Sequence, residues 1–454
     1  MFNSKQIHEF INKEYKEFAL YTISSRGIPS FSDTLTPLQR LILTIAPTGF
    51  QKSLNLVGDA FNRGYHHGNS SVESGLARLA RTYLNAENLL EGDGFFGTPI
   101  NPDAASARYT SVRIKPKIKT KLDEYKIINN IGKTDYFHDP LNINFPVGLL
   151  NFTIGISVGF ASRILPRKFE ELEKFMNNKK ADLKPYLQNY NGSIKQMDTE
   201  GVCWVFKGSV IQEKKGIRIT DVPPFIKYKT FLQKISNFID DKNFQIVTQN
   251  NSKDQIDILL VMDEKNVNQD IIEELERAVS IVVTENVTFV DENKVLEYKN
   301  VIDFLTDFRN NALYSKKLFL KKTNSIISEE IGVLNAKIEF INFMIGEKRK
   351  EKEIDKFLKK YEEDVKARLS NTKIREMSIE NVENIKNVLI PKEEELQKNN
   401  LEKLKEIQDV ISKTDFKRRN IVKENNVQIA KDFKDIEEFE DEELEENNVE
   451  QDLD

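Results

Sequence analysis

The sequence has little of the chemistry that builds disulfides or metal–thiolate sites. Cys203 is the only cysteine among 454 residues, and four histidines accompany it. One cysteine excludes an internal disulfide and a zinc site built on several cysteines, and it is typical of a reducing compartment. No apolar run is long enough to span a bilayer, and residues 1–15 carry charges where a signal peptide would be apolar. We therefore expect a cytoplasmic protein without a membrane segment.

A nucleotide-binding loop is also missing. The stretch Gly94–Thr98 is rich in glycine, but the Lys-Ser/Thr ending of a phosphate loop does not follow it. The stretch is therefore predicted to be a turn, and the chain is not expected to hydrolyse ATP by itself.

A chain of 454 residues is longer than one ordinary domain, and its length favours roughly two to four domains.

Acidic charge is concentrated at the end of the chain. Twelve of the 72 acidic residues lie in Asp435–Asp454, where no lysine or arginine occurs. The rest of the chain therefore carries 67 basic and 60 acidic residues, although the whole has a net charge of −5. A basic body with an acidic tail is common among nucleic-acid-binding proteins. Residues 433–454 are predicted to be a disordered acidic tail.

Residues 1–139 alternate short helical patterns with glycine, proline and asparagine breaks. Helices are predicted over Val57–Arg63 and Val72–Leu84, with the tight segment Gly64–Gly68 between them. A helix, a short turn and a second helix in a basic region are compatible with a helix-turn-helix or winged-helix module.

Residues 140–297 have a different pattern, which indicates an α+β domain. Val202–Ile219 alternates like paired strands, and Gln245–Val247 and Ile256–Met262 are typical of further strands. Helices are predicted over Phe169–Phe175, Tyr228–Ile239 and Ile271–Val283.

Residues 298–432 are rich in Lys, Glu, Ile and Leu and nearly free of Pro and Gly. Apolar residues at steps of 4 and 3 predict a coiled-coil seam. A second helix, interrupted at Pro391, would return beside the first. The simplest interpretation is two antiparallel arms with a small globule near Gly346–Ser378, and one long helical bundle is the alternative. The seam consists of Ile327, Ile331, Leu334, Ile338, Ile341 and Ile345.

The stretch Asn101–Lys119 carries the strongest chemical signal. Tyr109 directly follows Arg108, and Arg113 and Lys115 come soon after. A phenol beside a guanidinium in a basic segment suits attack on a phosphodiester, because the oxygen is a nucleophile and the cations neutralise the phosphate. The alternative is a half-buried strand tyrosine beside a solvated face of lysines.

Two further stretches carry groups that suit phosphate binding. Arg40 lies in a predicted helix that Pro37 opens, and helix N-termini attract anions. A plain surface arginine is the alternative. His66 and His67 lie in a glycine-flanked turn and could donate hydrogen bonds to phosphate oxygens. A metal site or a purely structural turn are the other interpretations, although no carboxylate or cysteine at ligand spacing accompanies the pair.

A succession of motifs resembles the breakage–reunion part of type IIA DNA topoisomerases. The resemblance covers roughly residues 18–425, and its histidine motif is similar to the branch of eukaryotic enzymes and medium subunits of T4-like phages. The motifs are Pro37-Leu38-Gln39-Arg40, Lys52-Ser53, Tyr65-His66-His67-Gly68, Phe96-Gly97-Thr98, Ala107-Arg108-Tyr109-Thr110, Phe145-Pro146 and Gly155-Ile156-Ser157-Val158-Gly159.

The resemblance implies an α+β multidomain fold. Residues 1–139 would form a winged-helix DNA-cleavage domain with the active-site tyrosine, and residues 140–297 a tower domain. Residues 298–432 would form a long antiparallel coiled coil with a small dimerisation globule. The acidic tail at residues 433–454 has no counterpart in the family pattern.

The resemblance also implies roles for individual residues. Tyr109 would attack a DNA phosphodiester and form a link to the 5′ phosphate, Arg108 would stabilise the phosphoryl group, and His67 would hydrogen-bond near the scissile phosphate. Ile156 would be an apolar wedge that bends the DNA. The residues expected to hold DNA are Arg40, Lys52, His66, Arg113 and Lys115.

The implied activity needs further subunits. Magnesium ions would be held by a TOPRIM domain of a partner subunit that also carries the ATPase, so no metal site is expected in this chain. Two copies of the chain would form a homodimer within a heterotetramer that acts on double-stranded DNA. The assembly would be an ATP-dependent type II DNA topoisomerase, an isomerase at the nucleoid of a bacterial or phage-infected cell.

Some positions depart from the family pattern. Thr36 stands where a lysine is usual, Leu41 where a second basic residue is common, and Asn69 where an acidic residue is usual. These changes weaken the expected grip on DNA but leave the nucleophile in place. The rival hypothesis is a non-catalytic DNA-binding coiled-coil protein of the chromosome-structuring kind. That hypothesis fits the charge split and the arms, but it does not explain the tyrosine and histidine motifs.

Overall fold

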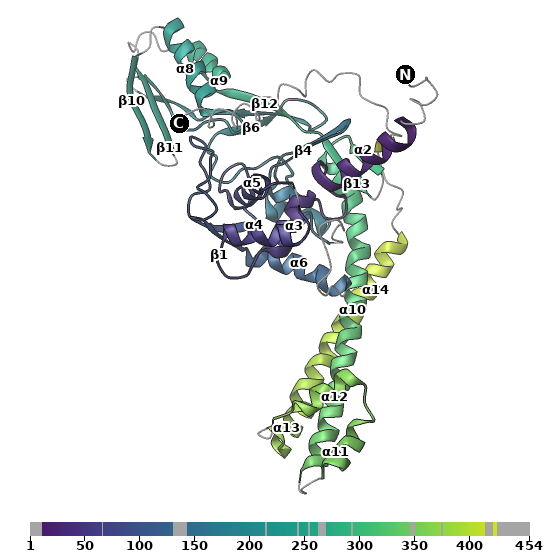
Figure 1. Ribbon diagram of the computed structural model, residues 1–454. Coiled ribbons are helices and arrows are strands. Elements are labelled where there is room, and N and C mark those ends of the chain that lie inside the picture. Colours follow the sequence, from purple (N-terminus) through teal and green to yellow (C-terminus); the bar gives the residue numbers. More distant parts are fainter. Residues whose placement is uncertain are drawn as a thin grey trace, which may run out of the picture.

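The computed structural model describes most of the chain and shows a broad body with a stalk of two long helices (Figure 1). A sheet-rich extension projects from the other side of the body. His66, residues 130–142 and the predicted acidic tail at residues 433–454 lie outside the described residues. The described residues are 11–65, 67–129, 143–213, 216–242, 245–252, 255–261, 269–291, 294–345, 350–373, 376–413 and 421–424.

Three helices pack against one another in the first part of the body: α3 (Pro37–Ile45), α4 (Ser53–Asn62) and α5 (Asn69–Ala80). Helix α3 begins with a capping box, because the Thr36 side chain and the Gln39 side chain each accept a hydrogen bond from the other residue's backbone N–H. Its first residue is proline, whose missing N–H would have no helical partner there. A chain segment with helical turns precedes them as η1 (Ile11–Tyr15), α2 (Lys16–Thr22) and η2 (Ile23–Gly27).

Helix α5 ends at Ala80 rather than at the predicted Leu84. Arg81 leaves the helix with extended backbone, and Leu84 has a left-handed φ of 63°. The Asn85 amide donates hydrogen bonds to the carbonyls of Arg78 and Arg81, which lie where the helix no longer supplies partners. The apolar periodicity continues past this cap, so the pattern alone overestimates the length of the helix.

A three-stranded antiparallel sheet lies beside these helices in the order β1-β3-β2. Strand β1 (Gln51–Lys52) precedes α4, β2 (Leu90–Asp93) follows α5, and β3 (Ser111–Ile114) starts just after Tyr109. Helix α6 (Pro116–Asn129) follows β3. The predicted tyrosine segment runs along the surface between these helices and this sheet, and the winged-helix interpretation of the arrangement stays a prediction.

One hydrophobic core joins this region to the base of the stalk. It combines side chains of α3, α4 and α5 with those of η3 (Val147–Leu150), β13 (Val287–Asp291) and the start of α10 (Val301–Met344). Phe289 and Phe304 are fully buried and stack with their ring centroids 3.9 Å apart. The core thus crosses the predicted boundary at residues 139 and 140, and the division into domains stays a prediction.

The sheet-rich extension is built from antiparallel pairs, with sheet orders β12-β7-β6 and β10-β11-β9-β8. Helices α8 and α9 contribute to a core with the second of these sheets, and β4 pairs with β5 as a separate hairpin. The elements are β4 (Thr153–Ser157), β5 (Phe160–Ile164), α7 (Phe169–Met176), β6 (Ser193–Gln196), β7 (Cys203–Lys207), β8 (Val210–Glu213), β9 (Gly216–Ile219), α8 (Tyr228–Lys242), β10 (Gln245–Ser252), β11 (Gln255–Val261), α9 (Gln269–Ala278) and β12 (Ser280–Thr284).

The predicted helix Ile271–Val283 is wrong in its last part. Helix α9 ends at Ala278, and the following residues form β12, which pairs with β7. The strand contains four successive β-branched residues, which favour extended backbone. Val282 is exposed whereas Val283 is buried, as expected for side chains that alternate between the two faces of a strand. A short strand directly after an amphipathic helix was thus predicted as a continuation of that helix.

The stalk consists of α10 and a returning helix, α14 (Ile390–Lys413). Leu320 of α10 packs with Leu404 of α14, whereas Ile341, further along α10, packs with Ile385 just before α14. The two arms are therefore antiparallel, as Figure 1 shows. Between them lie the short helices α11 (Glu351–Leu358), α12 (Glu363–Ser370) and α13 (Ile379–Asn384).

Pro391 does not interrupt the returning arm as predicted. The π-helical turn η6 (Ile385–Leu389) joins α13 to α14 without a break, and the Ile390 N–H donates to the Ile385 carbonyl. Proline has no N–H to donate and crowds the preceding turn, so a locally widened turn accommodates it.

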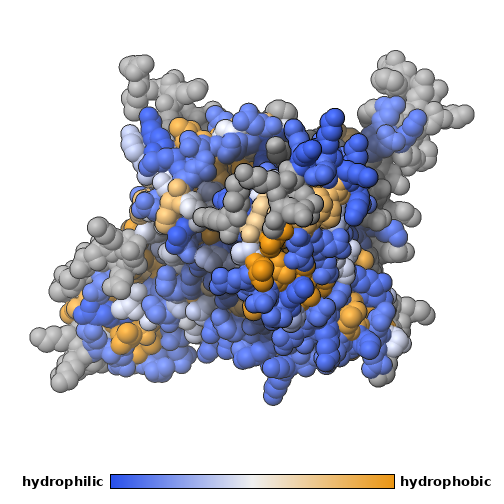
Figure 2. All heavy atoms as spheres, turned by 90° about the horizontal axis from the view of Figure 1, so that it is seen from below, coloured by the Kyte–Doolittle hydropathy of each residue, from blue (hydrophilic) through white to orange (hydrophobic). Residues whose placement is uncertain are grey.

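Strand pairing brings the last described segment back to the body. Strand β14 (Lys294–Tyr298) lies between β13 and β15 (Ile421–Glu424). Within the described part of the chain, no helix is long and apolar enough to cross a membrane. Figure 2, viewed toward the free end of the stalk, shows a largely hydrophilic surface with several separate apolar patches.

Candidate active site

Tyr109 lies on a tight turn at the surface. Its side chain is 68% exposed, and its backbone N–H donates to the Ser106 carbonyl at 2.8 Å. The guanidinium carbon of Arg108 lies 5.3 Å from the centre of the Tyr109 ring. The alternative of a half-buried strand tyrosine is therefore wrong, because the strand begins only at Ser111.

The turn is fastened to the first residues of α4. The backbone N–H groups of Ser53 and Leu54 donate to the carbonyls of Thr110 and Ala107, at 3.0 and 3.2 Å. The buried Thr110 hydroxyl donates to the Ser53 hydroxyl at 2.8 Å. These bonds occupy N–H groups that a helix start leaves without helical partners. They also place the positive end of the helix dipole beside the tyrosine, where negative charge is stabilised.

His67 is oriented by an arginine from a distant part of the chain. The Arg26 guanidinium approaches Nδ1 of His67 with Nε at 3.3 Å and Nη2 at 2.7 Å. A guanidinium has no acceptor, so Nδ1 must be the acceptor and the proton of a neutral imidazole resides on Nε2. The ring of Tyr65 packs edge-on against the imidazole, with the ring centroids 5.1 Å apart. Nε2–H is thereby presented as a hydrogen-bond donor.

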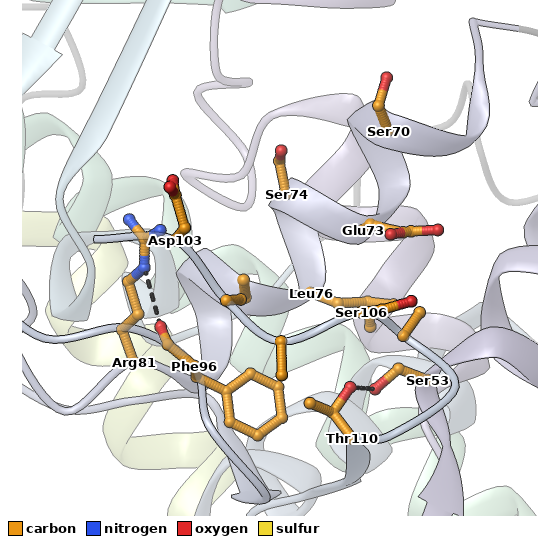
Figure 3. Close-up of a pocket in the computed structure, with 14 residues that line it drawn as sticks. Ser53, Ser70, Glu73, Ser74, Leu76, Arg81, Phe96, Asp103, Ser106 and Thr110 are labelled. Carbon is orange, nitrogen blue, oxygen red and sulfur yellow. Dashed lines mark hydrogen bonds between the residues drawn. The ribbon is translucent and has the colours of Figure 1, made fainter. Parts of the chain in front are cut away.

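A polar cavity of about 260 Å³ lies between helix α5 and the loop that leads to the tyrosine turn (Figure 3). Ser70, which follows the histidine turn, and Ser106, which precedes Arg108, both line it. Glu73 and Ser74 of α5 add further polar groups. Residues that line the cavity therefore follow the histidine motif and flank Arg108 and Tyr109 in sequence, whereas His67, Arg108 and Tyr109 themselves are not among them. Within the described ranges, no group of three or more His, Cys, Asp or Glu side chains is placed to hold a metal ion.

The predicted DNA-holding role of Arg40 is wrong in this structure. Its side chain is 2% exposed, and Nε lies 2.5 Å from Oδ2 of the fully buried Asp33. Nη2 also donates to the carbonyl of Leu35 at 3.2 Å. The guanidinium therefore points into the protein and fastens the loop before α3.

The other predicted DNA-holding cations lie around the small sheet. Lys52 is exposed at the junction of β1 and α4, next to the residues that hold the tyrosine turn. Arg113 is already ion-paired with Glu91 at 2.5 Å, and Lys115 lies 3.5 Å from Glu87. Of these three, Lys52 is the most exposed and could bind a phosphate directly. Arg113 and Lys115 would first have to give up their ion pairs with Glu91 and Glu87.

Ile156 projects from the β4–β5 hairpin and is 42% exposed. The hairpin is held against η2 by a close backbone approach. A Cβ atom added to Gly155 would lie 2.0 Å from the Gly27 carbonyl oxygen, and one added to Gly27 would lie 2.4 Å from the Ile156 carbonyl oxygen. Only glycine fits at both positions, so the position of Ile156 is fixed relative to the segment that carries Arg26.

Sequence reasoning missed two arginines of this site. Arg26 was not singled out because its partner His67 is 41 residues away. Arg81 lines the cavity and donates a hydrogen bond to the carbonyl of Phe96 (Figure 3). It donates a second hydrogen bond to the carbonyl of Pro102. No local signal marks either residue, because Arg26 lies eleven residues before the motif at Pro37 and Arg81 thirteen residues before the turn at Gly94.

The fold matches that of DNA-cleavage domains. The crystal structure of the DNA-binding, cleavage and re-ligation domain of Plasmodium falciparum topoisomerase II superimposes with a TM-score of 0.71 and 20% identity. The match covers 89% of this chain and 65% of that one. At this identity it establishes the fold.

The family follows from the sequence match. Residues 26–417 match the family described as the A subunit of DNA gyrase/topoisomerase IV, so the chain belongs to that family of type II topoisomerases. The predicted resemblance is thereby confirmed.

Individual relatives support the assignment. The DNA topoisomerase medium subunit of Enterobacteria phage T4 is 25% identical over 338 residues, which cover 67% of this chain and 73% of that protein. The DNA gyrase A subunit of Buchnera aphidicola subsp. Baizongia pistaciae is 22% identical over 356 residues, or 69% of this chain and 42% of that protein. The DNA gyrase A subunit of Streptomyces coelicolor is 30% identical over 199 residues, or 41% of this chain and 22% of that protein. The chain thus spans less than half the length of these two gyrase proteins.

Proposed function

We propose that the chain is the DNA-cleavage and religation subunit of an ATP-dependent type II DNA topoisomerase, with Tyr109 as nucleophile. The observation that carries the proposal is the exposed Tyr109 hydroxyl beside Arg108, on a turn fixed to the start of α4, in a member of the gyrase A family. An exposed phenol among cations suits reversible attack on a phosphodiester.

The proposed step exchanges one phosphoester for another. The Tyr109 oxygen forms a bond to phosphorus while the bond from phosphorus to the 3′ oxygen of the neighbouring nucleotide breaks. The phenolic proton is lost on attack, and the leaving oxygen takes up a proton to give a 3′ hydroxyl. The DNA end stays attached through a 5′-phosphotyrosyl link, and religation is the reverse reaction.

Three nearby groups have roles in this proposal. Arg108 would neutralise charge on the phosphoryl oxygens, and its place over the Tyr109 ring keeps the two groups together. His67 would donate from Nε2 to a non-bridging oxygen, since Arg26 holds its other nitrogen. His66, proposed from the resemblance as a DNA contact, lies outside the described residues.

The remaining chemistry is proposed to come from a partner subunit. Mg²⁺ would stabilise the leaving oxygen and would be held by a TOPRIM domain of that partner, which would also bind ATP. The described residues of this chain form no cluster of metal ligands, so the residues of this chain are proposed to act on the DNA and not on the ion.

DNA binding is proposed to use Lys52 for the backbone and Ile156 for bending. An exposed apolar side chain at the tip region of a rigid hairpin can unstack a base step, and the bent DNA then contacts more protein. Two copies of the chain would supply the two tyrosines that a double-strand break requires. The stalk end carries exposed apolar side chains suited to that contact, namely Ile379, Val388 and Leu389.

The test is covalent trapping. The full chain, reconstituted with its ATPase/TOPRIM partner, is mixed with supercoiled plasmid and Mg²⁺ and quenched with detergent. We expect protein-linked double-strand breaks with wild type and none with Tyr109→Phe. The control Tyr21→Phe alters a similarly exposed tyrosine on α2 and should cleave normally. Adducts that persist in Tyr109→Phe would refute the nucleophile, and their absence from wild type would favour the non-catalytic DNA-binding alternative.

A further inference from the structure

We propose that Arg81 is a positioning residue for Tyr109, which sets the shape of the loop that leads to the tyrosine turn. The proposal rests on the proposed cleavage function and adds a residue to its machinery. Arg81 lies directly after α5, where the chain leaves the helix with extended backbone. Its side chain therefore points away from the helix axis toward the loop between β2 and β3.

The Arg81 guanidinium bridges the two sides of that loop. Nε donates to the carbonyl oxygen of Phe96 at 3.2 Å (Figure 3). Nη2 donates to that of Pro102 at 2.7 Å. The loop is closed by a hydrogen bond from the Ala105 N–H to the Phe95 carbonyl at 2.9 Å. One planar cation thus fixes the distance between the outgoing segment at Phe96 and the returning segment at Pro102. The ammonium group of a lysine would do so less well, because it lacks the rigid planar fork of donors.

Close backbone contact also limits the distance between the outgoing and returning segments of the loop. Gly97 has a φ of 88°, and an added Cβ atom would lie 2.4 Å from the Pro102 carbonyl oxygen. The Tyr83 hydroxyl also donates to this oxygen, at 3.4 Å. The Pro102 carbonyl therefore accepts hydrogen bonds from Arg81 and Tyr83 and lies close to the backbone of Gly97. These contacts fix the position of the returning segment at Pro102.

The returning segment leads straight to the nucleophile. Residues 103–107 line the polar cavity together with Arg81, and the Ala107 carbonyl accepts from the Leu54 N–H of α4. Tyr109 follows two residues later. A shift of Pro102 would therefore move the chain between two anchors, Arg81 at one end and the start of α4 at the other, and would tilt the tyrosine turn.

Arg81 is also tied to the sheet-rich extension. Its own carbonyl accepts hydrogen bonds from the side chains of Asn85 and Gln188, at 3.3 and 3.4 Å. Asn189 donates to the neighbouring Thr82 carbonyl at 3.1 Å. A second cavity of about 670 Å³ opens between this segment and the loop, and Arg81 and Asp103 stand in the walls of both cavities. The backbone of this segment thus contacts the extension, whereas the guanidinium of Arg81 contacts the tyrosine loop.

The guanidinium of Arg81 is half-buried. Desolvation lowers the pKa of Arg81, while the phenol of Tyr83 and the carboxyl of Asp103 act to raise it. Its guanidinium donates to backbone carbonyls, so a neutral amide could keep part of the geometry. Substitution by Gln removes the charge of Arg81, and substitution by Lys keeps the charge but removes the planar two-donor geometry. The two variants therefore separate these two contributions.

The test compares Arg81→Gln and Arg81→Lys with Arg78→Gln in the reconstituted complex. Arg78 lies on the exposed side of the same helix and carries the same charge, so it controls for long-range attraction of DNA. Rates of covalent adduct formation, affinity for a linear duplex and melting temperature are measured for each. Misplacement of a reacting group by about 1 Å costs roughly 100-fold in rate.

We expect Arg81→Gln to slow adduct formation roughly 10- to 100-fold, with duplex affinity within about twofold of wild type. Arg81→Lys should recover part of the rate, because one cationic donor can still reach a carbonyl, and Arg78→Gln should cleave like wild type. A wild-type rate in Arg81→Gln would overturn the proposal. So would a parallel fall of rate, duplex affinity and melting temperature in both Arg81 variants, which would indicate a merely structural role. Loss of the proposed function itself would show separately, as wild-type protein that forms no adduct.

Discussion

The guanidinium of Arg26 holds Nδ1 of His67 across 41 residues of sequence, with Nη2 at 2.7 Å from the ring nitrogen. This contact joins the N-terminal segment η2 to the turn before α5. Since η2 also packs against Gly155 of the β4–β5 hairpin, one short segment contacts both the histidine turn and the proposed wedge hairpin.

We predict that Arg26→Ala slows DNA cleavage more than it weakens DNA binding. A hydrogen bond to a charged group contributes about 1.5–3 kcal/mol, which corresponds to roughly 10- to 150-fold in rate if His67 acts in the transition state. The measurement is the rate of adduct formation at saturating duplex. Arg63→Ala, which removes an exposed arginine at the end of α4, is the matched control. Equal rates in both variants would show that the Arg26–His67 contact has no part in cleavage.

We predict that Arg40→Met destabilises the fold and does not simply weaken DNA binding. Asp33 is fully buried, so removal of its partner leaves an uncompensated charge at a cost of about 3–5 kcal/mol. Chemical denaturation measures the loss. The double variant Asp33→Leu with Arg40→Met should be more stable than the single one, since no buried charge is left alone. A single variant as stable as wild type, with reduced DNA affinity, would restore the DNA-holding role.

We predict that Ile156→Ala reduces bending of the bound duplex while the melting temperature stays nearly unchanged. The side chain is partly exposed, so its truncation removes little buried contact. Bending is measured by energy transfer between dyes at the two ends of the duplex. Undiminished bending would dismiss the wedge.

We predict that Gly155→Ala disturbs bending through the backbone. Its Cβ atom would overlap the Gly27 carbonyl, so the hairpin or η2 must move, and stability should fall together with bending. Gly58→Ala is the control, because no atom lies within 4 Å of an added Cβ there and helical alanine is favoured over glycine by up to about 1 kcal/mol. Wild-type bending in Gly155→Ala would show that the position of the hairpin tolerates this shift.

We predict that the chain dimerises through the free end of the stalk. Ile379 and Val388 are 65% and 54% exposed there, and burial of such side chains favours association. Analytical ultracentrifugation at micromolar concentration should show a dimer, and the double variant Ile379→Asp with Val388→Asp a monomer. Ile302→Asp, which alters a similarly exposed residue at the base of the stalk, should remain dimeric. A wild-type monomer at this concentration would contradict the prediction.

The sequence predicts those features that depend on local patterns. The expectation of two antiparallel arms rests on apolar residues at steps of 4 and 3, and the candidate role of Tyr109 rests on its place directly after Arg108. The tight turn that exposes Tyr109 is not predicted by any local pattern. The burial of Arg40 could not be predicted in this way, because the same helix start is compatible with an exposed arginine and with one whose side chain pairs with Asp33. Arg26 and Arg81 act on partners that only the folded chain brings close, so no local pattern reveals them.

The end of α5 and the last part of α9 illustrate a second cause. In both places apolar residues continue with helical spacing after the helix has stopped. The Asn85 side chain ends the first helix, and pairing of β12 with β7 ends the second. The first stop depends on a side-chain hydrogen bond that apolar periodicity does not register, and the second on a strand that is distant in sequence.

The most direct measurement is identification of the amino acid that carries the DNA. Covalent adducts trapped from the reconstituted complex are digested with nuclease and trypsin, and the modified peptides are sequenced by mass spectrometry. Trypsin cuts after Arg108 and Arg113, so we expect the peptide Tyr109–Arg113 with a 5′-linked nucleotide on its tyrosine. A nucleotide attached to any other residue, or attached through its 3′ end, would contradict the assignment.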